Sequence, residues 1–207
     1  MEILFKNSDI IVVIKPAGVS SEETAGLNMH DLIRESTGEK EIFTVHRLDN
    51  VTSGVMVYAF NKRAAAYLSE QIADKTFIKE YAAVVHGIVC PEKGIMEDLL
   101  FKDSRRNKSF VVKRERKGVK KASLEYSVTA TKGELSLVKI RLHTGRTHQI
   151  RVQFASRKHP VYGDGKYGAS DNITYIALFS QTLTFKEPSC GRLVSFTAEL
   201  PHWEFFS

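Results

Sequence analysis

Cysteine is scarce in this chain of 207 residues, which contains only Cys90 and Cys190. The two lie far apart in the sequence, and neither belongs to a C-x-x-C pair. We therefore expect neither a disulfide framework nor a zinc site, and the composition suits a reducing cytoplasm.

Long apolar runs are also missing. The longest aliphatic run, Ile10 to Ile14, is far shorter than the roughly 20 residues that a membrane span requires. No basic region precedes the apolar residues of the N-terminus, so no signal peptide and no membrane association are expected. With 43% hydrophobic and 26% charged residues, the composition is that of a globular protein.

Acidic residues are rare in one segment, 102–121. The whole chain has a net charge of +6, but this segment alone has ten basic and two acidic residues, a net +8, which leaves −2 elsewhere. Such a local patch suits a polyanion such as nucleic acid, although a solvated lysine-rich loop explains the run equally well. We expect the segment to form a hairpin with a long arm.

The remaining pattern predicts many strands and few helices. Strands are expected within 2–15 and over 42–48, 54–60, 79–86, 122–130, 134–142, 175–185 and 193–200, and helices over 29–35, after Asn61 and over 147–157. No βαβ alternation is present, which favours an α+β fold with a largely antiparallel sheet. Without a repeat or a break in composition, one domain over 1–207 is expected.

A single carboxylate marks the stretch His46-Arg47-Leu48-Asp49-Asn50-Val51-Thr52-Ser53-Gly54. Arg47 precedes Asp49 by two residues, so on a strand the two side chains would point the same way, and the cation would favour the ionised carboxylate. A turn or capping aspartate is the alternative; it explains Asp49 and its polar neighbours but not Arg47.

A second stretch, Gly145-Arg146-Thr147-His148-Gln149-Ile150-Arg151, places two arginines near the start of an expected helix, with Thr147 as a possible cap. A helix start favours a carboxylate or phosphate nearby. His143 and His148 do not have the spacing of a ligand pair, so no metal is expected.

The two stretches closely resemble the motifs HRLD-x-x-TSG and GR-[ST]-HQ-[IL]-R of the RluA-like RNA pseudouridine synthases. Ile11 to Gly18 resembles the family's V-x-KP-x-G element, and Tyr162 to Gly168 resembles its GD-x-x-YG loop. The resemblance covers most of the chain and implies a stand-alone catalytic domain without the S4-type domain of many relatives.

The resemblance also implies a mechanism. These enzymes break the bond between uracil N1 and the ribose, rotate the base and rejoin it through C5, using one aspartate and no cofactor. A glycosidase would ordinarily need two flanking carboxyl groups, and no such pair is evident. By resemblance Asp49 is the nucleophile or base, by covalent attack or through a glycal; Tyr81 stacks on the target base; Arg151 pairs with the aspartate.

RNA contacts follow from the same resemblance and from the basic segment. Arg47 would fill the gap that an extruded uridine leaves, since extrusion costs a few kcal/mol. The other expected RNA-binding residues are Lys79, Arg146, Thr147, His148, Gln149, Arg105, Arg106, Lys113 and Arg114. The family's small residues and His-Pro after the KPAG turn are replaced by Val19-Ser20-Ser21-Glu22-Glu23, so the target, ribosomal or transfer RNA, stays open. A monomer is the default expectation.

Two other functions compete with this interpretation. One is a non-catalytic RNA-binding or ribosome-assembly protein on the same fold, which would not require Asp49, Arg47, Tyr81 and Arg151 as a set. The other is an RNA nuclease or nucleoside hydrolase, which predicts chain cleavage or free uracil.

Overall fold

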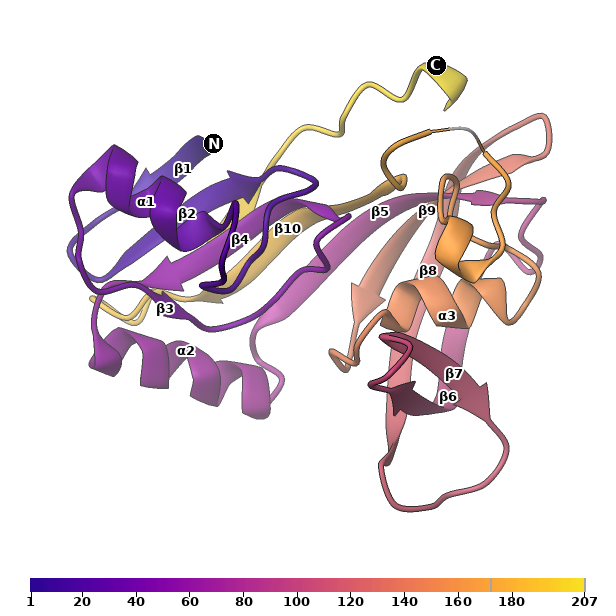
Figure 1. Cartoon of the computed structure of the whole chain (residues 1–207), viewed down its shortest axis with the longest axis horizontal. Coiled ribbons are helices and arrows are strands. Elements are labelled where there is room, and N and C mark those ends of the chain that lie inside the picture. The colour runs from indigo at the N-terminus through magenta and orange to yellow at the C-terminus, as the bar shows by residue number, and fades with distance from the viewer. Residues whose placement is uncertain (172, 207) are drawn as a thin grey trace. The chain divides into compact units, whose positions relative to one another are not determined.

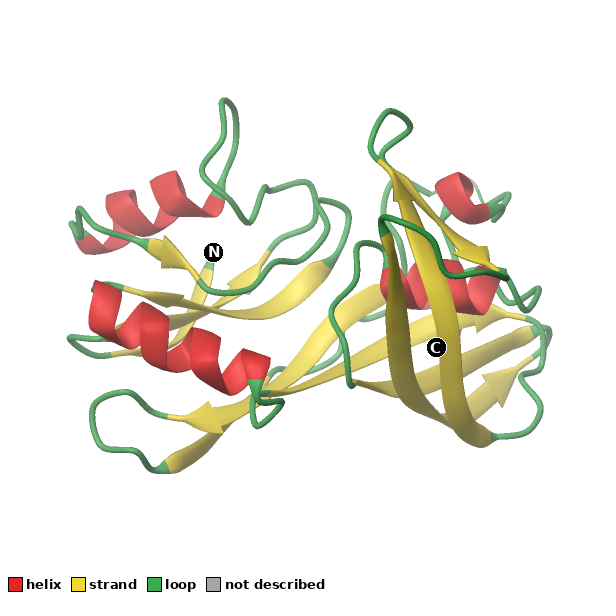
Figure 2. Cartoon of the chain, turned by 90° about the horizontal axis from the view of Figure 1, so that it is seen from below, coloured by secondary structure: helices red, strands yellow, loops and turns green. Residues whose placement is uncertain are grey.

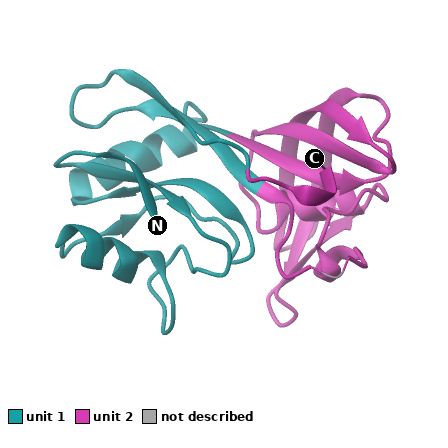
Figure 3. Cartoon of the chain, turned by 90° about the horizontal axis from the view of Figure 1, so that it is seen from above, with its two compact units in different colours: residues 1–79, 179–200 teal, residues 80–178, 201–207 magenta. Residues whose placement is uncertain are grey.

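The protein is described here by a computed structural model that covers residues 1–171 and 173–206. Its chain divides into two compact units (Figure 3): unit 1 contains Met1–Lys79 and Phe179–Leu200, and unit 2 contains Glu80–Leu178 and Pro201–Ser207. Unit 1 is thus assembled from two segments that are distant in sequence.

Unit 1 is built on a sheet with the strand order β1-β2-β4-β10 (Figure 1). Its strands are β1 (Glu2–Lys6), β2 (Ile10–Lys15), β4 (Ser53–Ala59) and β10 (Leu178–Lys186), with β3 (Phe43–Thr44) on β4 and β11 (Leu193–Thr197) on β10. All these pairs are antiparallel except β4 with β10. Residues 10–13 and 55–59 are fully buried, so β2 and β4 are covered on both faces.

The helices of unit 1 begin at asparagine caps. The side chain of Asn28 accepts a hydrogen bond from the Asp31 amide at the start of α1 (Met29–Thr37), and Gly38 ends this helix with φ 75°. Asn61 accepts from the amide of Ala64 at the start of α2 (Lys62–Ala73), which packs against β4. Such caps satisfy amides that the first helical turn leaves unpaired.

Unit 2 is an antiparallel sheet with the order β5-β9-β8-β6-β7. The strands are β5 (Ile78–His86), β6 (Lys93–Asp103), β7 (Lys108–Val112), β8 (Val119–Lys132) and β9 (Leu135–Leu142); α3 (Gln149–Ala155) and the 3-10 turns η1 (Gly165–Tyr167) and η2 (Glu204–Phe206) complete it (Figure 2). Burial alternates along β9, as expected for a strand with one covered face.

The predicted fold class, α+β with a largely antiparallel sheet, is confirmed. None of the helices in the described parts of the chain is long and apolar enough to cross a membrane. The basic segment 102–121 comprises the end of β6, the turn 104–107, all of β7, the loop 113–118 and the start of β8.

Three local predictions were wrong. The strand expected over 42–48 is only Phe43–Thr44, so the first motif runs through irregular chain until Ser53 and Gly54, which begin β4. The third helix begins at Gln149 and not at Thr147, because His148 adopts a left-handed conformation with φ 54°. The strand expected from Tyr175 begins at Leu178.

Candidate active site

In unit 1, a buried lysine anchors the loop that contains Asp49. Lys15 is 0% exposed, and its Nζ donates hydrogen bonds to the carbonyl oxygens of Pro16 (2.8 Å), Val19 (2.8 Å) and Asn50 (3.2 Å). Three acceptors match the three N–H groups of an ammonium. Lys15 therefore ties the turn after β2 to the residue that follows Asp49.

The charge of Lys15 also bears on the site. Burial lowers the pKa of its ammonium to about 8, and the negative charge of Asp49 opposes this change. Asp49 itself is half-buried in the loop. A carboxylate next to a desolvated ammonium interacts more strongly than it would in water, because the local dielectric is low.

The residues on either side of Asp49 are fixed by backbone contacts. The amide of Val57 donates to Nε2 of the buried His46 (3.3 Å), and the amide of Gly18 donates to the carbonyl of Asn50 (2.8 Å). Gly54 has φ 123°, and a Cβ atom there would collide with the backbone of Ser180. The glycine of the Thr-Ser-Gly sequence is thus required by the close approach of β4 and β10.

Arg47 does not share a strand face with Asp49, because the loop is irregular at this point. Its guanidinium donates to the carboxylate of Glu22 (2.9 Å), and both side chains are about half exposed, at 56% and 52%. The cation expected next to the aspartate is therefore paired in this structure with an acid from the segment after the KPAG turn.

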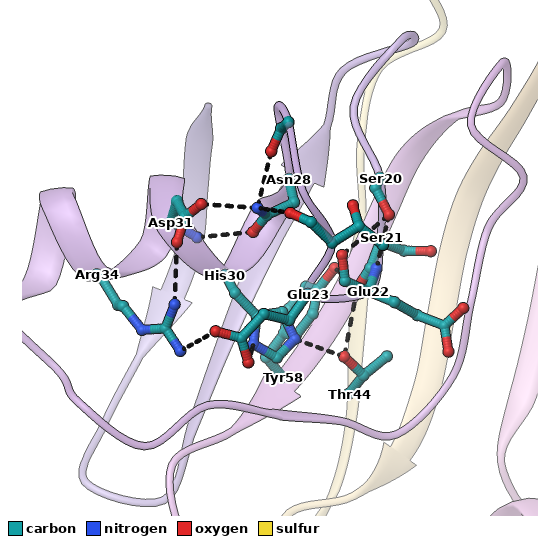
Figure 4. Close-up of polar contacts among 12 residues, drawn as sticks. Ser20, Ser21, Glu22, Glu23, Asn28, His30, Asp31, Arg34, Thr44 and Tyr58 are labelled. Atoms are coloured by element: carbon teal, nitrogen blue, oxygen red, sulfur yellow. Dashed lines mark hydrogen bonds and ion pairs between the residues drawn. The ribbon is translucent and has the colours of Figure 1, made fainter.

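That segment, residues 20–28 (Figure 4), contacts the Asp49 loop through Ser21. The hydroxyl of Ser21 donates to the carbonyl of Leu48 (2.9 Å), and its own carbonyl accepts from the hydroxyl of the buried Tyr58 (3.0 Å). Burial raises the pKa of Tyr58, which keeps this hydroxyl a donor. Sequence reasoning treated residues 19–23 as a departure from the family pattern; in the structure they hold part of the motif.

A second polar network in Figure 4 fixes the rest of this segment against α1. Nε2 of the buried His30 lies 2.7 Å from the hydroxyl of Thr44, and Arg34 is paired with Glu23 (2.7 Å) and Asp31 (2.9 Å). Burial lowers the pKa of His30. These contacts order the residues next to Glu22.

Lys79 and Tyr81 come from β5. Burial lowers the pKa of Lys79, whose ammonium lies 5.9 Å from the centre of the Phe77 ring in unit 1. Tyr81 is 5% exposed in unit 2 and is opposite Ile140 in the β5–β9 register. A tyrosine buried in a strand packs in the core. Stacking on the target base, which the resemblance implies, would be a second role.

Arg151 forms a buried ion pair in unit 2. Its Nε and one terminal nitrogen donate to the two carboxylate oxygens of Asp164, at 2.6 and 2.9 Å, and the two residues are 4% and 1% exposed. The guanidinium also lies 5.2 Å from the centre of the Tyr167 ring. A bidentate pair of this kind fixes the plane of the guanidinium.

The turn before α3 is held together by Gln149. Its side-chain oxygen accepts from the Arg146 amide (3.0 Å) and from the hydroxyl of Thr144 (2.7 Å), and its side-chain nitrogen donates to the carbonyl of Ser123 (3.1 Å). Gln149 and His148 are both buried, whereas Arg146 is half-buried and its Nε donates to the carbonyl of Lys121 (2.9 Å).

Unit 1 places the Asp49 carboxylate on a loop held by several hydrogen bonds, and unit 2 contains Arg151, whose orientation is fixed by Asp164. Among the described residues, no three His, Cys, Asp or Glu side chains are grouped so as to hold a metal ion.

The family model for RNA pseudouridylate synthase matches residues 9–156, which include the Asp49 loop and the turn before α3. The chain belongs to this family. It is an RNA pseudouridine synthase, an isomerase, as the resemblance of its motifs predicted.

Relatives and solved structures agree with this assignment. The chain is 32% identical to the uncharacterized RNA pseudouridine synthase YlyB of Bacillus subtilis and to the ribosomal large subunit pseudouridine synthase C of Buchnera aphidicola (subspecies Baizongia pistaciae). Each match covers 97% of this chain and 69% or 67% of the relative. The structure of human RNA pseudouridylate synthase domain containing 1 shares the fold, with a TM-score of 0.84 at 23% identity over 100% of this chain and 86% of that one.

Sequence reasoning missed three residues that hold the candidate site. Lys15 was interpreted as part of a turn, Asp164 as part of a glycine-rich loop, and Tyr167 received no role. The sequence held one signal for Lys15, a lysine that ends an uninterrupted apolar strand. The ion pair of Asp164 with Arg151 joins separate elements, so no local pattern predicts it.

Proposed function

We propose that this synthase converts specific uridines of large-subunit ribosomal RNA to pseudouridine, with Asp49 as its nucleophile or base. The supporting observation is the anchoring of the Asp49 loop: a buried ammonium, Ser21 and Gly18 fix the backbone on both sides of one half-buried carboxylate. The names of relatives such as the Buchnera synthase C point to ribosomal RNA. Transfer RNA is the alternative substrate, and the cytoplasm is the proposed location.

The reaction needs one such carboxylate because the base never leaves the enzyme. The N1–C1′ bond breaks, the uracil rotates, a C5–C1′ bond forms, and the C5 proton is lost while N1 gains one. Arg151 would pair with Asp49 during this sequence, and Tyr81 would stack on the base. Both roles are inferred from the resemblance of the motifs.

RNA contacts are proposed for the exposed cations. Arg47 would leave Glu22 and occupy the space of the extruded uridine, while Arg105, Arg106, Lys113 and Arg114, all exposed, would meet phosphates. Arg146, Thr147 and Lys79 would complete the contact. Since His148 and Gln149 are buried, we assign them support of the turn and not direct contact.

The test asks which pseudouridines are lost from RNA when the gene is absent, and whether Asp49 is needed to restore them. Ribosomal and transfer RNA from cells with and without the gene would be mapped by carbodiimide-dependent reverse-transcription stops. We expect one or more stops to vanish without the gene, to return with the wild type or Asp74→Asn, and to stay absent with Asp49→Asn. Asp74 is an exposed carboxylate of the same unit and controls for the loss of charge.

A purified reaction separates this proposal from its competitors. RNA labelled with tritium at C5 of uridine should release tritium as the C5 proton exchanges, while its length stays unchanged and no free uracil forms. An active Asp49→Asn enzyme would contradict the mechanism, and an unchanged stop pattern in both classes of RNA would favour the binding protein.

A further inference from the structure

The start of β7, inside the basic segment, is joined to the turn η1 by reciprocal hydrogen bonds. The ammonium of Lys108 donates to the carbonyl of Lys166, and the ammonium of Lys166 donates to the carbonyl of Asn107 (3.1 Å). The hydroxyl of Ser109 donates to the carbonyl of Thr147 (2.7 Å). The β6–β7 hairpin is therefore not a free arm but is docked on two segments of the family motifs.

Tyr167 lies at the centre of this junction. Its hydroxyl accepts a hydrogen bond from the amide of Ser109 (2.8 Å) and is 2.9 Å from Nδ1 of His148. Its ring packs against the small apolar cluster of Leu100, Ala122 and Val152. One side chain thus contacts the hairpin, the turn before α3 and the core of unit 2.

Two cations lie close to the Tyr167 ring. The guanidinium of Arg151 is 5.2 Å and the ammonium of Lys108 is 4.9 Å from its centre. An aromatic face stabilises a nearby cation, more so when the cation is desolvated as Arg151 is. Lys108 belongs to the basic segment and Arg151 to the second motif, so Tyr167 connects a cation of the basic segment with a buried one.

We propose that Tyr167 is a positioning residue that couples RNA contact at the β6–β7 hairpin to the orientation of Arg151. Its hydroxyl fixes the hairpin, and its ring, together with Asp164, fixes the guanidinium. RNA that engages the hairpin then restricts Tyr167 and, through it, Arg151. This inference rests on the proposed function, because the importance of Arg151 to the reaction comes from there.

Two substitutions separate the parts of the side chain. Tyr167→Phe removes the hydroxyl and keeps the ring, so we expect KM for RNA to rise about 3-fold to 10-fold with kcat nearly unchanged. Tyr167→Leu removes the ring as well, so kcat should fall by about 5-fold to 30-fold. Tyr126→Phe is the matched control, since its hydroxyl donates to the carbonyl of Pro91 (3.1 Å), outside the β6–β7 hairpin, and its loss should move neither constant.

A spectroscopic measurement tests the coupling without turnover. The Arg151 Nε–H resonance, assigned with an Arg151→Lys variant, should exchange slowly in the wild type and shift when an oligouridylate is added. In Tyr167→Phe it should stay slow but lose the shift, and in Tyr167→Leu it should exchange faster. An identical shift in wild type and Tyr167→Phe, or unchanged kcat and exchange in Tyr167→Leu, would overturn the inference. A wild type that makes no pseudouridine would instead contradict the proposed function.

Discussion

His46 opens the first motif, but its imidazole is buried in unit 1 next to the Phe77 ring, with centroids 5.6 Å apart. Its Nε2 must be unprotonated to accept the amide hydrogen of Val57. Burial, and then the charge of Lys79, lower its pKa from 6.5 to about 3. The residue is therefore a neutral structural acceptor behind the Asp49 loop.

Acid should destabilise the fold through His46. Between pH 6.5 and about 3 the unfolded chain binds a proton at this residue that the folded chain does not. Stability present above pH 6.5 is thus lost as the pH falls, by roughly 5 kcal/mol at most. Urea unfolding over this pH range measures how the free energy of unfolding depends on pH. We expect a weaker dependence for His46→Gln than for the wild type. His143→Gln, at a half-exposed site, should retain the wild-type dependence.

Asp164 offers a second test at this scale. Asp164→Asn keeps the size of the side chain but leaves the buried Arg151 without its counter-charge, so we expect a loss of about 3–5 kcal/mol of unfolding free energy. Urea denaturation measures it. Asp98→Asn is the control in the same unit, because its partner Arg157 is 36% exposed and such a pair contributes less. Equal losses in the two variants would contradict the role given to burial.

At the scale of elements, the sequence predicted those helix ends and strands that depend on neighbouring residues. Asn61 marked the start of α2, and the apolar stretches of β2 and β4 marked buried strands, because caps and strand patterns act over a few residues. The cap formed by Asn28 was not predicted. The loop 45–52 could not be predicted, since its path depends on contacts with distant residues. Ser21 bonds Leu48, which lies 27 positions away, and Lys15 bonds Asn50, which lies 35 positions away.

The segment 20–28 and the Asp49 loop are joined by the Glu22–Arg47 ion pair. If Arg47 contacts RNA as proposed, this pair must break. Glu22→Gln removes the competing carboxylate, so we expect RNA to bind about 2-fold to 5-fold more tightly, a small gain because exposed pairs contribute little. Fluorescence anisotropy with a labelled ribosomal RNA fragment measures it. Glu23→Gln, which alters a neighbour paired with Arg34, should leave the affinity unchanged; a similar gain there would indicate general charge repulsion.

At the scale of the whole molecule, positive charge is concentrated in one segment of unit 2, and the remainder of the chain is slightly acidic. If this segment contacts RNA, affinity should fall with salt at roughly −0.7 in log–log slope per phosphate. The double variant Lys113→Gln/Arg114→Gln should reduce the slope by about 1.4. Lys62→Gln/Lys75→Gln removes the same charge from around α2 and should keep it; equal slopes in all three proteins would exclude the segment as the RNA contact.

The parallel seam between β4 and β10, where Gly54 meets Ser180, has a consequence for synthesis on the ribosome. Translation delivers β1 to β4 first, then the whole of residues 80–178, and only afterwards the strand that closes β4. Until then the start of β4, at Ser53 and Gly54, lacks its β10 partner, and an unpaired strand edge is the kind of surface that favours aggregation. Unit 2 can complete its own sheet during this interval, so we expect strands β5 to β9 to fold before the sheet of unit 1, whose synthesis begins first, is complete.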